Sequence, residues 1–263
     1  MNQQWHWQIW QDYSYLTCDL LSPWQHGFFT SEFYPRTPED LTLILQPQTL
    51  ACRVKQVHGN LVLTPQEIAT IVSSENYHNS LAEADGIISD RPEQSVWVAS
   101  ADCTPVLIGD VLTGQVSAIH AGWRGTALKI VQSAIALFLK FGSKQENLRI
   151  AIGPGISGEV YQVAQSVALE VCRSIISDAQ SKTDAEMLTE LKEIPNSPIL
   201  DDPLPGKARL DVSRVNQIQL QQLGISLEQI AIAPYCTYHQ SDRLFSYRRT
   251  GEKKVQWSGI IAK

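Results

Sequence analysis

Short apolar runs of strand type, separated by turns and by one helix-type segment, fill the middle of the chain. Residues 96–101 (VWVASA), 105–109 (PVLIG) and 115–120 (QVSAIH) precede the helix-type segment, and residues 148–152 follow it. Their β-branched and aromatic side chains favour strands. Because turns join some of these runs directly while helices lie between others, the pattern predicts an α/β (α+β) fold of layered, mixed β-sheets flanked by helices.

One amphipathic helix is predicted over residues 126–141. Four apolar residues recur there at helical spacing, namely Leu128, Val131, Ile135 and Phe138. The spacing predicts one continuous helix with all four side chains in the core.

The C-terminal half contains a second helix signal and a segment rich in helix breakers. Asp211 is a typical N-cap residue, and the apolar residues after it include Val212, Val215 and Leu223. Residues 229–233 predict a late strand. Residues 194–209 contain four prolines and a glycine and predict an ordered loop or excursion within one domain.

The composition excludes several classes of protein. The chain has 21 Lys and Arg against 27 Asp and Glu, and its net charge of −6 disfavours nucleic acid and anionic membranes as partners. No run approaches the ~20 apolar residues of a membrane span, and the N-terminus does not resemble a secretory signal. The five cysteines are widely spaced and form no CxxC pair, which favours a reducing, cytoplasmic location.

Three segments combine Gly or Pro with a possible metal ligand at the end of an apolar run. They are KQVHG, ADCTP and HAGWRG, and their possible ligands are His58, Cys103 and His120. Two imidazoles and a thiolate suit Zn²⁺ and leave a fourth position open, as in catalytic sites. The alternative is three unrelated residues, because no compact metal motif is present.

The HAGWRG segment also offers a cation and an aromatic ring beside His120. Arg124 is suited to bind phosphate or carboxylate at the start of a helix, or to brace the turn against Asp102. Trp123 is either a core residue or a surface on which a base stacks. Cys103 is either a metal ligand or a nucleophile, and both roles require a nearby histidine.

Other motifs have plain structural interpretations beside functional ones. GPGISG (153–158) lacks the pattern of a phosphate-binding loop and predicts a tight turn. FSYRR (245–249) either completes an anion or purine pocket or forms an edge strand with exposed arginines. Asp85 either orients a ligand histidine or belongs to an Asp-Gly turn. The remaining histidines are predicted to be surface or core residues, namely His6, His26, His78 and His239.

Six segments in order resemble the YfiH-type family, historically called the multicopper polyphenol oxidase (laccase) family. They are KQVHG, EADGIISD, ADCTPVLI, AIHAGWRGT, IGPGISGEVYQV and CTYHQSDRLFSYRRTG. The resemblance implies one YfiH-like domain over residues 1–263, with the first fifty residues matching least. It implies phosphorolysis of purine nucleosides (adenosine, inosine, guanosine and methylthioadenosine), with adenosine deaminase activity alongside. Bacterial members are also linked to editing of peptidoglycan precursors.

The resemblance also implies functional residues. The zinc ligands would be His58, Cys103 and His120. The catalytic residues would be Cys103, Arg124 and Asp102. The residues that bind nucleoside and phosphate would be Lys55, Gln56, Trp123 and Arg248. The family commonly has Arg after the glycine that follows Ser-Tyr-Arg-Arg, whereas this chain has Glu252, so its affinity or specificity is expected to differ.

Alternative functions use the same residues. Six histidines are too few for a multicopper cluster, although one His₂Cys set could bind a single copper and support weak polyphenol oxidation. A metal-free hydrolase of peptidoglycan precursors would use Cys103 as nucleophile and a histidine as base. A non-catalytic protein would use the metal only for stability. The sequence does not predict an oligomeric state.

Overall fold

The computed structural model describes residues 4–74 and 81–263, and His78 lies outside them. Fifteen strands form three sheets in the described part of the chain. The first sheet has the order β1 (Trp5–Trp10), β2 (Tyr13–Cys18), β3 (His26–Phe29), β15 (Gln256–Ile261), β7 (Gln94–Ser100) and β4 (Leu50–Cys52). The second has the order β14 (Ile230–Ile232), β10 (Leu148–Ile152), β8 (Thr104–Asp110), β9 (Val116–Ala121), β6 (Gly86–Ile88) and β5 (Val62–Leu63). The third has the order β11 (Gln162–Ala164), β13 (Lys207–Leu210) and β12 (Ile199–Asp201).

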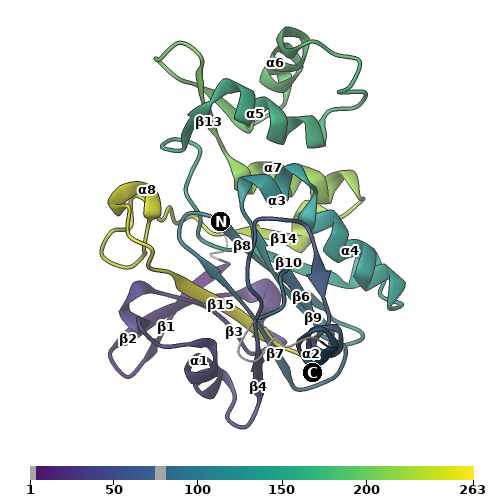
Figure 1. The fold of residues 1–263 in the computed structure, drawn as a ribbon, viewed down its shortest axis with the longest axis vertical. Helices are drawn as coiled ribbons and strands as arrows, with labels where there is room; N and C mark the ends of the chain where they lie inside the picture. The colour runs from purple at the N-terminus through teal and green to yellow at the C-terminus, as the bar shows by residue number, and fades with distance from the viewer. Residues whose placement is uncertain (1–3, 75–80) are drawn as a thin grey trace.

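Helices flank the sheets, as Figure 1 shows. The α-helices are α1 (Pro38–Leu45), α2 (Pro65–Ser74), α3 (Trp123–Ala127), α4 (Ile130–Lys140), α5 (Gln165–Cys172), α6 (Asp184–Glu193), α7 (Val212–Gln222) and α8 (Tyr247–Thr250). Short 3₁₀ turns span Asp19–Leu21, Ser31–Phe33, Gln145–Asn147, Arg173–Ile175 and Leu227–Gln229. Parallel pairs (β4 with β7, β5 with β6, β10 with β14) occur among antiparallel ones. The predicted fold class of mixed sheets flanked by helices is therefore confirmed.

Three apolar clusters hold the layers together. One lies between the first two sheets and includes Val98 and Leu107. A second lies between the second sheet and helices α4 and α7, around Phe138. A third joins α5, α6 and the small third sheet, which stand together at the top of Figure 1.

The second sheet brings distant loops to one end. Because β8 runs antiparallel to β9 and to β10, its first residues lie beside the last residues of both strands. The starts of β5 and β6 lie at the same end, since β6 is antiparallel to β9 and parallel to β5. The end of β14 joins them through its parallel pairing with β10. Segments from six parts of the chain therefore meet at one end of the second sheet.

The strands and helices follow the sequence pattern with a few exceptions. Residues 148–152 form β10, and the Asp211 carboxylate accepts the N–H of Arg214 at the start of α7, as an N-cap does. The predicted loop at residues 194–209 is wrong in part, because β12 and the start of β13 lie within it. FSYRR does not form an edge strand, because residues 247–250 are the helix α8.

The single helix predicted over residues 126–141 is wrong. Lys129 has a left-handed backbone (φ 62°, ψ 44°), which separates α3 from α4. The break rotates Leu128 out of the core, and 53% of it is exposed. Val131, Ile135 and Phe138 are buried as predicted, because all three lie after the break.

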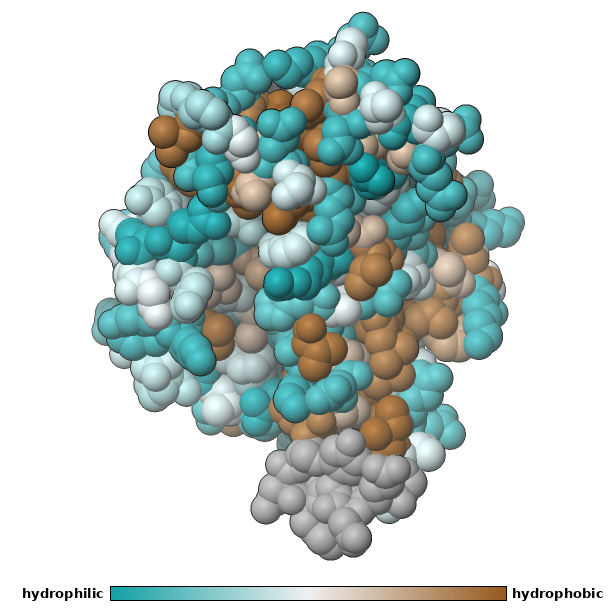
Figure 2. All heavy atoms as spheres, turned by 45° about the horizontal axis from the view of Figure 1, so that its top comes forward, coloured by the Kyte–Doolittle hydropathy of each residue, from teal (hydrophilic) through white to brown (hydrophobic). Residues whose placement is uncertain are grey.

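The described surface is mainly hydrophilic in the view of Figure 2, with apolar side chains gathered in a band down one side. Within residues 4–74 and 81–263, no helix has the length and apolar character needed to cross a membrane. All five cysteines are free thiols in this structure.

Replacing Lys129 with glycine should raise the free energy of unfolding by about 0.5–1 kcal/mol, because glycine adopts a left-handed backbone without the Cβ clash. Lys140→Gly, at the exposed end of α4, is the matched control and should lower it by about 1 kcal/mol. Urea denaturation measures both. A loss of stability in both variants would contradict the strain assigned to Lys129.

Candidate metal and substrate site

His58, Cys103 and His120 meet at the loop end of the second sheet. His58 precedes β5, Cys103 precedes β8, and His120 is the penultimate residue of β9. One possible ligand atom of each residue lies within 4.8 Å of those of the other two. The two imidazole rings stand 4.9 Å apart, centroid to centroid, and are nearly perpendicular. The structure therefore brings together the three residues that the sequence offered as metal ligands.

A buried carboxylate fixes both histidines. Asp85 Oδ1 lies 2.8 Å from His120 Nδ1, and the same carboxylate accepts the backbone N–H groups of Val57, His58 and Gly59 at 3.2, 2.9 and 2.6 Å. His58 itself has a left-handed backbone (φ 62°), which this network holds in place. With Nδ1 committed to Asp85, His120 presents Nε2 to the site. Asp85 thus orients a candidate ligand and does more than form an Asp-Gly turn.

The charges of Asp85, His120 and Cys103 stabilise one another. Burial opposes ionisation of the Cys103 thiol, but hydrogen bonds from His120 and His58 and their positive charges lower its pKa below that of an ordinary thiol. Burial likewise disfavours the His120 cation, but Asp85 and Cys103 raise its pKa. Cys103 is therefore poised as a thiolate, which is the form that binds metals or acts as a nucleophile.

Gly122 leaves room for the three side chains. A Cβ at this position would lie 3.0 Å from Cys103 Sγ and 3.3 Å from His58 Cδ2. A Cβ at Gly125 would lie 2.7 Å from the Gly59 carbonyl oxygen, so the second glycine of HAGWRG lets α3 approach the His58 loop. Both glycines in this motif thus serve close packing around the site.

The donor set fits a zinc ion. Two imidazoles, which bind a metal through a deprotonated ring nitrogen, and a thiolate converge, and three protein ligands leave a coordination position for water or substrate. The set would also accept a single copper ion, since copper binds such donors tightly. Asp85 supplies the carboxylate to which a ligand histidine usually donates its other ring N–H.

A cavity of about 720 Å³ opens beside this group. Trp123, Arg124 and Arg248, all expected to bind substrate or act in catalysis, line it. Gln56 lines it too, but both ends of its amide bond the backbone of Ala99 at 2.7–2.8 Å, so it ties the His58 loop to β7.

Lys55 does not line this cavity. The Lys55 Nζ instead lies 2.8 Å from Glu83 Oε1, and both side chains are exposed. The motif KQVHG therefore contributes its histidine and its glutamine to the cavity, whereas its lysine pairs with an acid outside it.

Arg124 does not brace its turn against Asp102. The Arg124 guanidinium lies over the Trp123 ring at 4.4 Å, and no ion pair joins it to a carboxylate in the part of the chain that the structure describes. Asp102 instead accepts hydrogen bonds from the hydroxyl of Thr237 at 2.6 Å and from the backbone N–H of Arg248 at 2.7 Å. Both of its oxygens are thus engaged, and its backbone is left-handed (φ 85°).

Two residues of the site were not selected from the sequence. Tyr161 lines the cavity beneath the Arg248 guanidinium, which lies 4.8 Å from its ring centre and donates to the Gln162 carbonyl. Burial raises the pKa of the Tyr161 phenol to about 12, so it stays protonated. Thr237 is fully buried behind Asp102. Both lie in motifs quoted above, but only the fold shows that they face Asp102 and Arg248.

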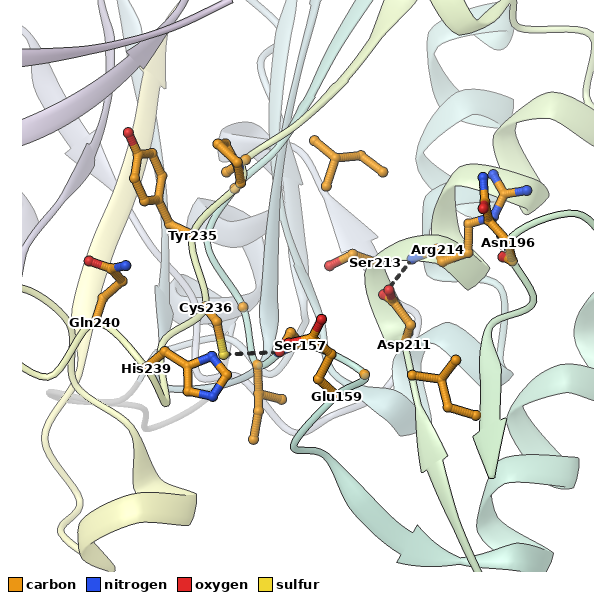
Figure 3. Close-up of a pocket in the computed structure, with 18 of the residues that line it drawn as sticks. Ser157, Glu159, Asn196, Asp211, Ser213, Arg214, Tyr235, Cys236, His239 and Gln240 are labelled. Carbon is orange, nitrogen blue, oxygen red and sulfur yellow. Dashed lines mark hydrogen bonds between the residues drawn. The ribbon is translucent and has the colours of Figure 1, made fainter. Parts of the chain in front are cut away.

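A second cavity, of about 550 Å³, lies along the same edge beyond the turn at residues 153–158 (Figure 3). It contains His239, and the dashed lines join Ser157 N to Cys236 Sγ and the Asp211 carboxylate to Arg214 N. The turn itself packs closely, as predicted, since a Cβ at Gly155 would lie 2.9 Å from Thr104 Oγ1.

The other described histidines have structural partners. His6 pairs with exposed Asp19 at 2.9 Å, and buried His26 bonds the backbone of Cys18 and Trp24. The prediction that these two are surface and core histidines is confirmed.

Comparison with known proteins places the chain in one family. Residues 39–263 match the family described as multi-copper polyphenol oxidoreductase laccase. A purine nucleoside phosphorylase from Synechocystis sp. is 53% identical over 259 residues, which are 98% of this chain and 97% of that protein. A purine nucleoside phosphorylase from Bacteroides thetaiotaomicron is 31% identical over 82% of this chain and 74% of its own length. An adenosine deaminase, RL5, from an unknown prokaryotic organism is 24% identical over 80% of this chain and 70% of its own length.

Solved structures share the fold. YlmD from Geobacillus stearothermophilus superposes with a TM-score of 0.78 at 21% identity, covering 98% of both chains. The hypothetical protein YfiH of Bacillus licheniformis gives a TM-score of 0.75 at 23% identity, covering 98% of this chain and 99% of its own. The resemblance to the YfiH-type family drawn from the six segments is thereby confirmed.

Asp85→Asn should lower the free energy of unfolding by about 3 kcal/mol, because it breaks a buried ion pair and places an amide against backbone N–H donors. It should also weaken zinc binding by about 10–100-fold, since His120 loses its orienting partner. Denaturation and a zinc titration measure the two effects. Asp110 is another fully buried aspartate, at the far end of β8 from the candidate ligands, and Asp110→Asn should leave zinc affinity unchanged. An equal loss of zinc affinity in both variants would contradict this role of Asp85.

Iodoacetamide should modify Cys103 of the metal-free protein at unusually low pH. A lowered pKa keeps the thiolate populated as the pH falls, so the midpoint of the rate should lie below the value of about 8.5 for a free thiol. His120→Ala should move it upward. Mass spectrometry of the Cys103 peptide follows the rate, and Cys52, whose pKa burial raises to about 11, is the internal control. A Cys103 midpoint at or above that of a free thiol would contradict the assigned electrostatics.

Proposed function

The chain belongs to the multi-copper polyphenol oxidoreductase laccase family, and we propose that it is a zinc-dependent purine nucleoside phosphorylase. Its substrates would be phosphate and adenosine, inosine, guanosine or methylthioadenosine. The observation that carries the proposal is the meeting of a His₂Cys donor set with two arginines and aromatic rings in one cavity. The names of the two phosphorylase relatives support it.

His58, Cys103 and His120 would hold the zinc ion. Bound there, zinc supplies a Lewis acid that polarises an oxygen of phosphate or water. Polyphenol oxidation is the weaker alternative, because an oxygen-reducing copper cluster needs more imidazoles than this group provides. Of the remaining histidines that the structure describes, His6 and His26 have other partners, and His239 lines the other cavity.

The cations of the cavity would bind the phosphate. Guanidinium groups form paired hydrogen bonds with phosphate oxygens and offset their charge. Arg124 meets no carboxylate in the described chain, and Arg248 directs one N–H at the Gln162 carbonyl and keeps others free. Trp123 and Tyr161 would offer ring faces to the purine.

The departing purine needs a proton, and Tyr161 is one of the groups lining the cavity that would give it. The Tyr161 phenol stays protonated at neutral pH because burial raises its pKa. Asp102, expected as a catalytic residue, has both oxygens engaged by Thr237 and Arg248. We therefore assign Asp102 a positioning role, in which it holds the Cys103 loop and α8 together, and Tyr161 the role of proton donor.

Adenosine deamination is a second candidate activity of the same cavity. It is favoured by the relative named adenosine deaminase. Water in place of phosphate would attack the purine ring, and ammonia would leave. If both reactions use one site, His120→Ala should abolish both, and the loss of only one would disprove the shared site.

Chromatography of the zinc-loaded protein with adenosine or inosine, with and without phosphate, tests the proposal. Free base should appear only with phosphate. His58→Ala should abolish its release, and Arg124→Gln should slow it by about 10²–10³-fold, as for loss of a positioned charge. His6→Ala, which alters a surface histidine, should leave the rate unchanged.

Other results would point elsewhere. Base release that survives chelation but not iodoacetamide would indicate a metal-free Cys–His hydrolase. A lower melting temperature on chelation, with no turnover before or after, would indicate a structural metal. No free base and no deaminated product from zinc-loaded protein would overturn the nucleoside proposal in favour of hydrolysis of a peptidoglycan precursor.

A further inference from the structure

The mouth of the candidate cavity carries a second group of positive charges. Arg53 follows β4, and Lys253 and Lys254 precede β15, and all three line the cavity. They meet because β4 and β15 both pair with β7, from its two sides. We call these three residues the cationic rim.

The rim keeps an excess of positive charge after its neighbours are counted. Arg53 lies 3.2 Å from Glu39, and Lys254 lies 3.0 Å from Glu252. Lys253 is exposed, and no carboxylate pairs with it in residues 4–74 and 81–263. In a chain with a net charge of −6, such an excess at a cavity mouth favours anions locally.

Binding of the inorganic phosphate by Arg124 and Arg248 does not require the charges of the cationic rim. Arg124 lies over the Trp123 ring on the segment that follows β9. Arg248 lies over the Tyr161 ring on the segment that precedes β15. These two charges suffice for one phosphate dianion as co-substrate. The cavity, of about 720 Å³, lies well within the range of pockets that hold drug-sized ligands. The rim therefore fits a second anionic group carried by the other substrate.

Resting on the proposed function, we infer that the rim is a subsite for a phosphate on C5′ of the purine nucleoside. C5′ is the exocyclic carbon of the ribose and extends away from C1′, where the reaction occurs. Purine nucleoside 5′-monophosphates should then bind more tightly than nucleosides. In their phosphorolysis the C1′–N9 bond breaks and its electron pair leaves with the purine, which takes up a proton. An oxygen of inorganic phosphate bonds C1′, giving free base and ribose 1,5-bisphosphate.

Calorimetric titration of the full-length protein with adenosine and with AMP tests this subsite without requiring turnover. AMP should bind about fivefold or more tightly at low salt, and the preference should shrink at high salt, because exposed charges are screened. Lys253→Gln should lower the ratio of AMP to adenosine affinity about two- to fivefold, and Glu252→Gln should raise it by a similar factor. Lys144→Gln removes an exposed lysine outside the cavity and should leave both affinities unchanged.

Two results would overturn the subsite. One is equal binding of adenosine and AMP; the other is a preference for AMP that neither Lys253→Gln nor Glu252→Gln changes. Failure of the proposed function would look different, because AMP would still bind in preference to adenosine while neither compound released base with phosphate. Base release from adenosine without any preference for AMP would leave the phosphorylase standing and remove the subsite.

Discussion

The Asp85 carboxylate is the interaction on which the candidate site depends. It is fully buried and accepts three backbone N–H groups of the His58 loop as well as the His120 ring. A buried carboxylate costs several kcal/mol unless such donors compensate it. Because the compensation comes from two segments, burial of one charge forces the His58 loop and β9 into a single arrangement. The donor set is therefore organised by the protein's own hydrogen bonds.

A second carboxylate, that of Asp102, organises the wall of the cavity beside the candidate metal ligands. Asp102 joins the segment before β8 to Thr237 and to the first turn of α8. Its backbone carbonyl also accepts the N–H of Ile156 in the GPGISG turn. Asp102 therefore places Cys103 on one side and Arg248 on the other, and each of its carboxylate oxygens accepts one hydrogen bond in doing so. One aspartate thus supports the candidate metal ligands, and the other supports the wall of the cavity that we propose binds substrate.

Local patterns predicted much of this fold, and tertiary contacts explain what they missed. The strand at residues 148–152 and the cap at Asp211 depend on neighbouring residues, so the sequence specified them. The break at Lys129 could not be predicted, because no Gly or Pro lies at that position and the left-handed backbone is adopted by a lysine. The candidate metal ligands could be predicted from the residue types, but their closeness in space depends on the order of strands in the second sheet. Thr237 could not be chosen, since it reaches Asp102 across 135 positions of sequence.

Together these features describe a candidate active site at one end of the second sheet, in which the metal-donor set lies beside cations and aromatic rings and the cationic rim lines the same cavity. A crystal structure of the protein grown with zinc, phosphate and a slowly reacting nucleoside analogue would test this description most directly. We expect anomalous zinc density bounded by His58, Cys103 and His120, with phosphate on Arg124 and Arg248 and the sugar between them. Zinc elsewhere, or the analogue in the cavity lined by Ser157 and His239, would contradict it.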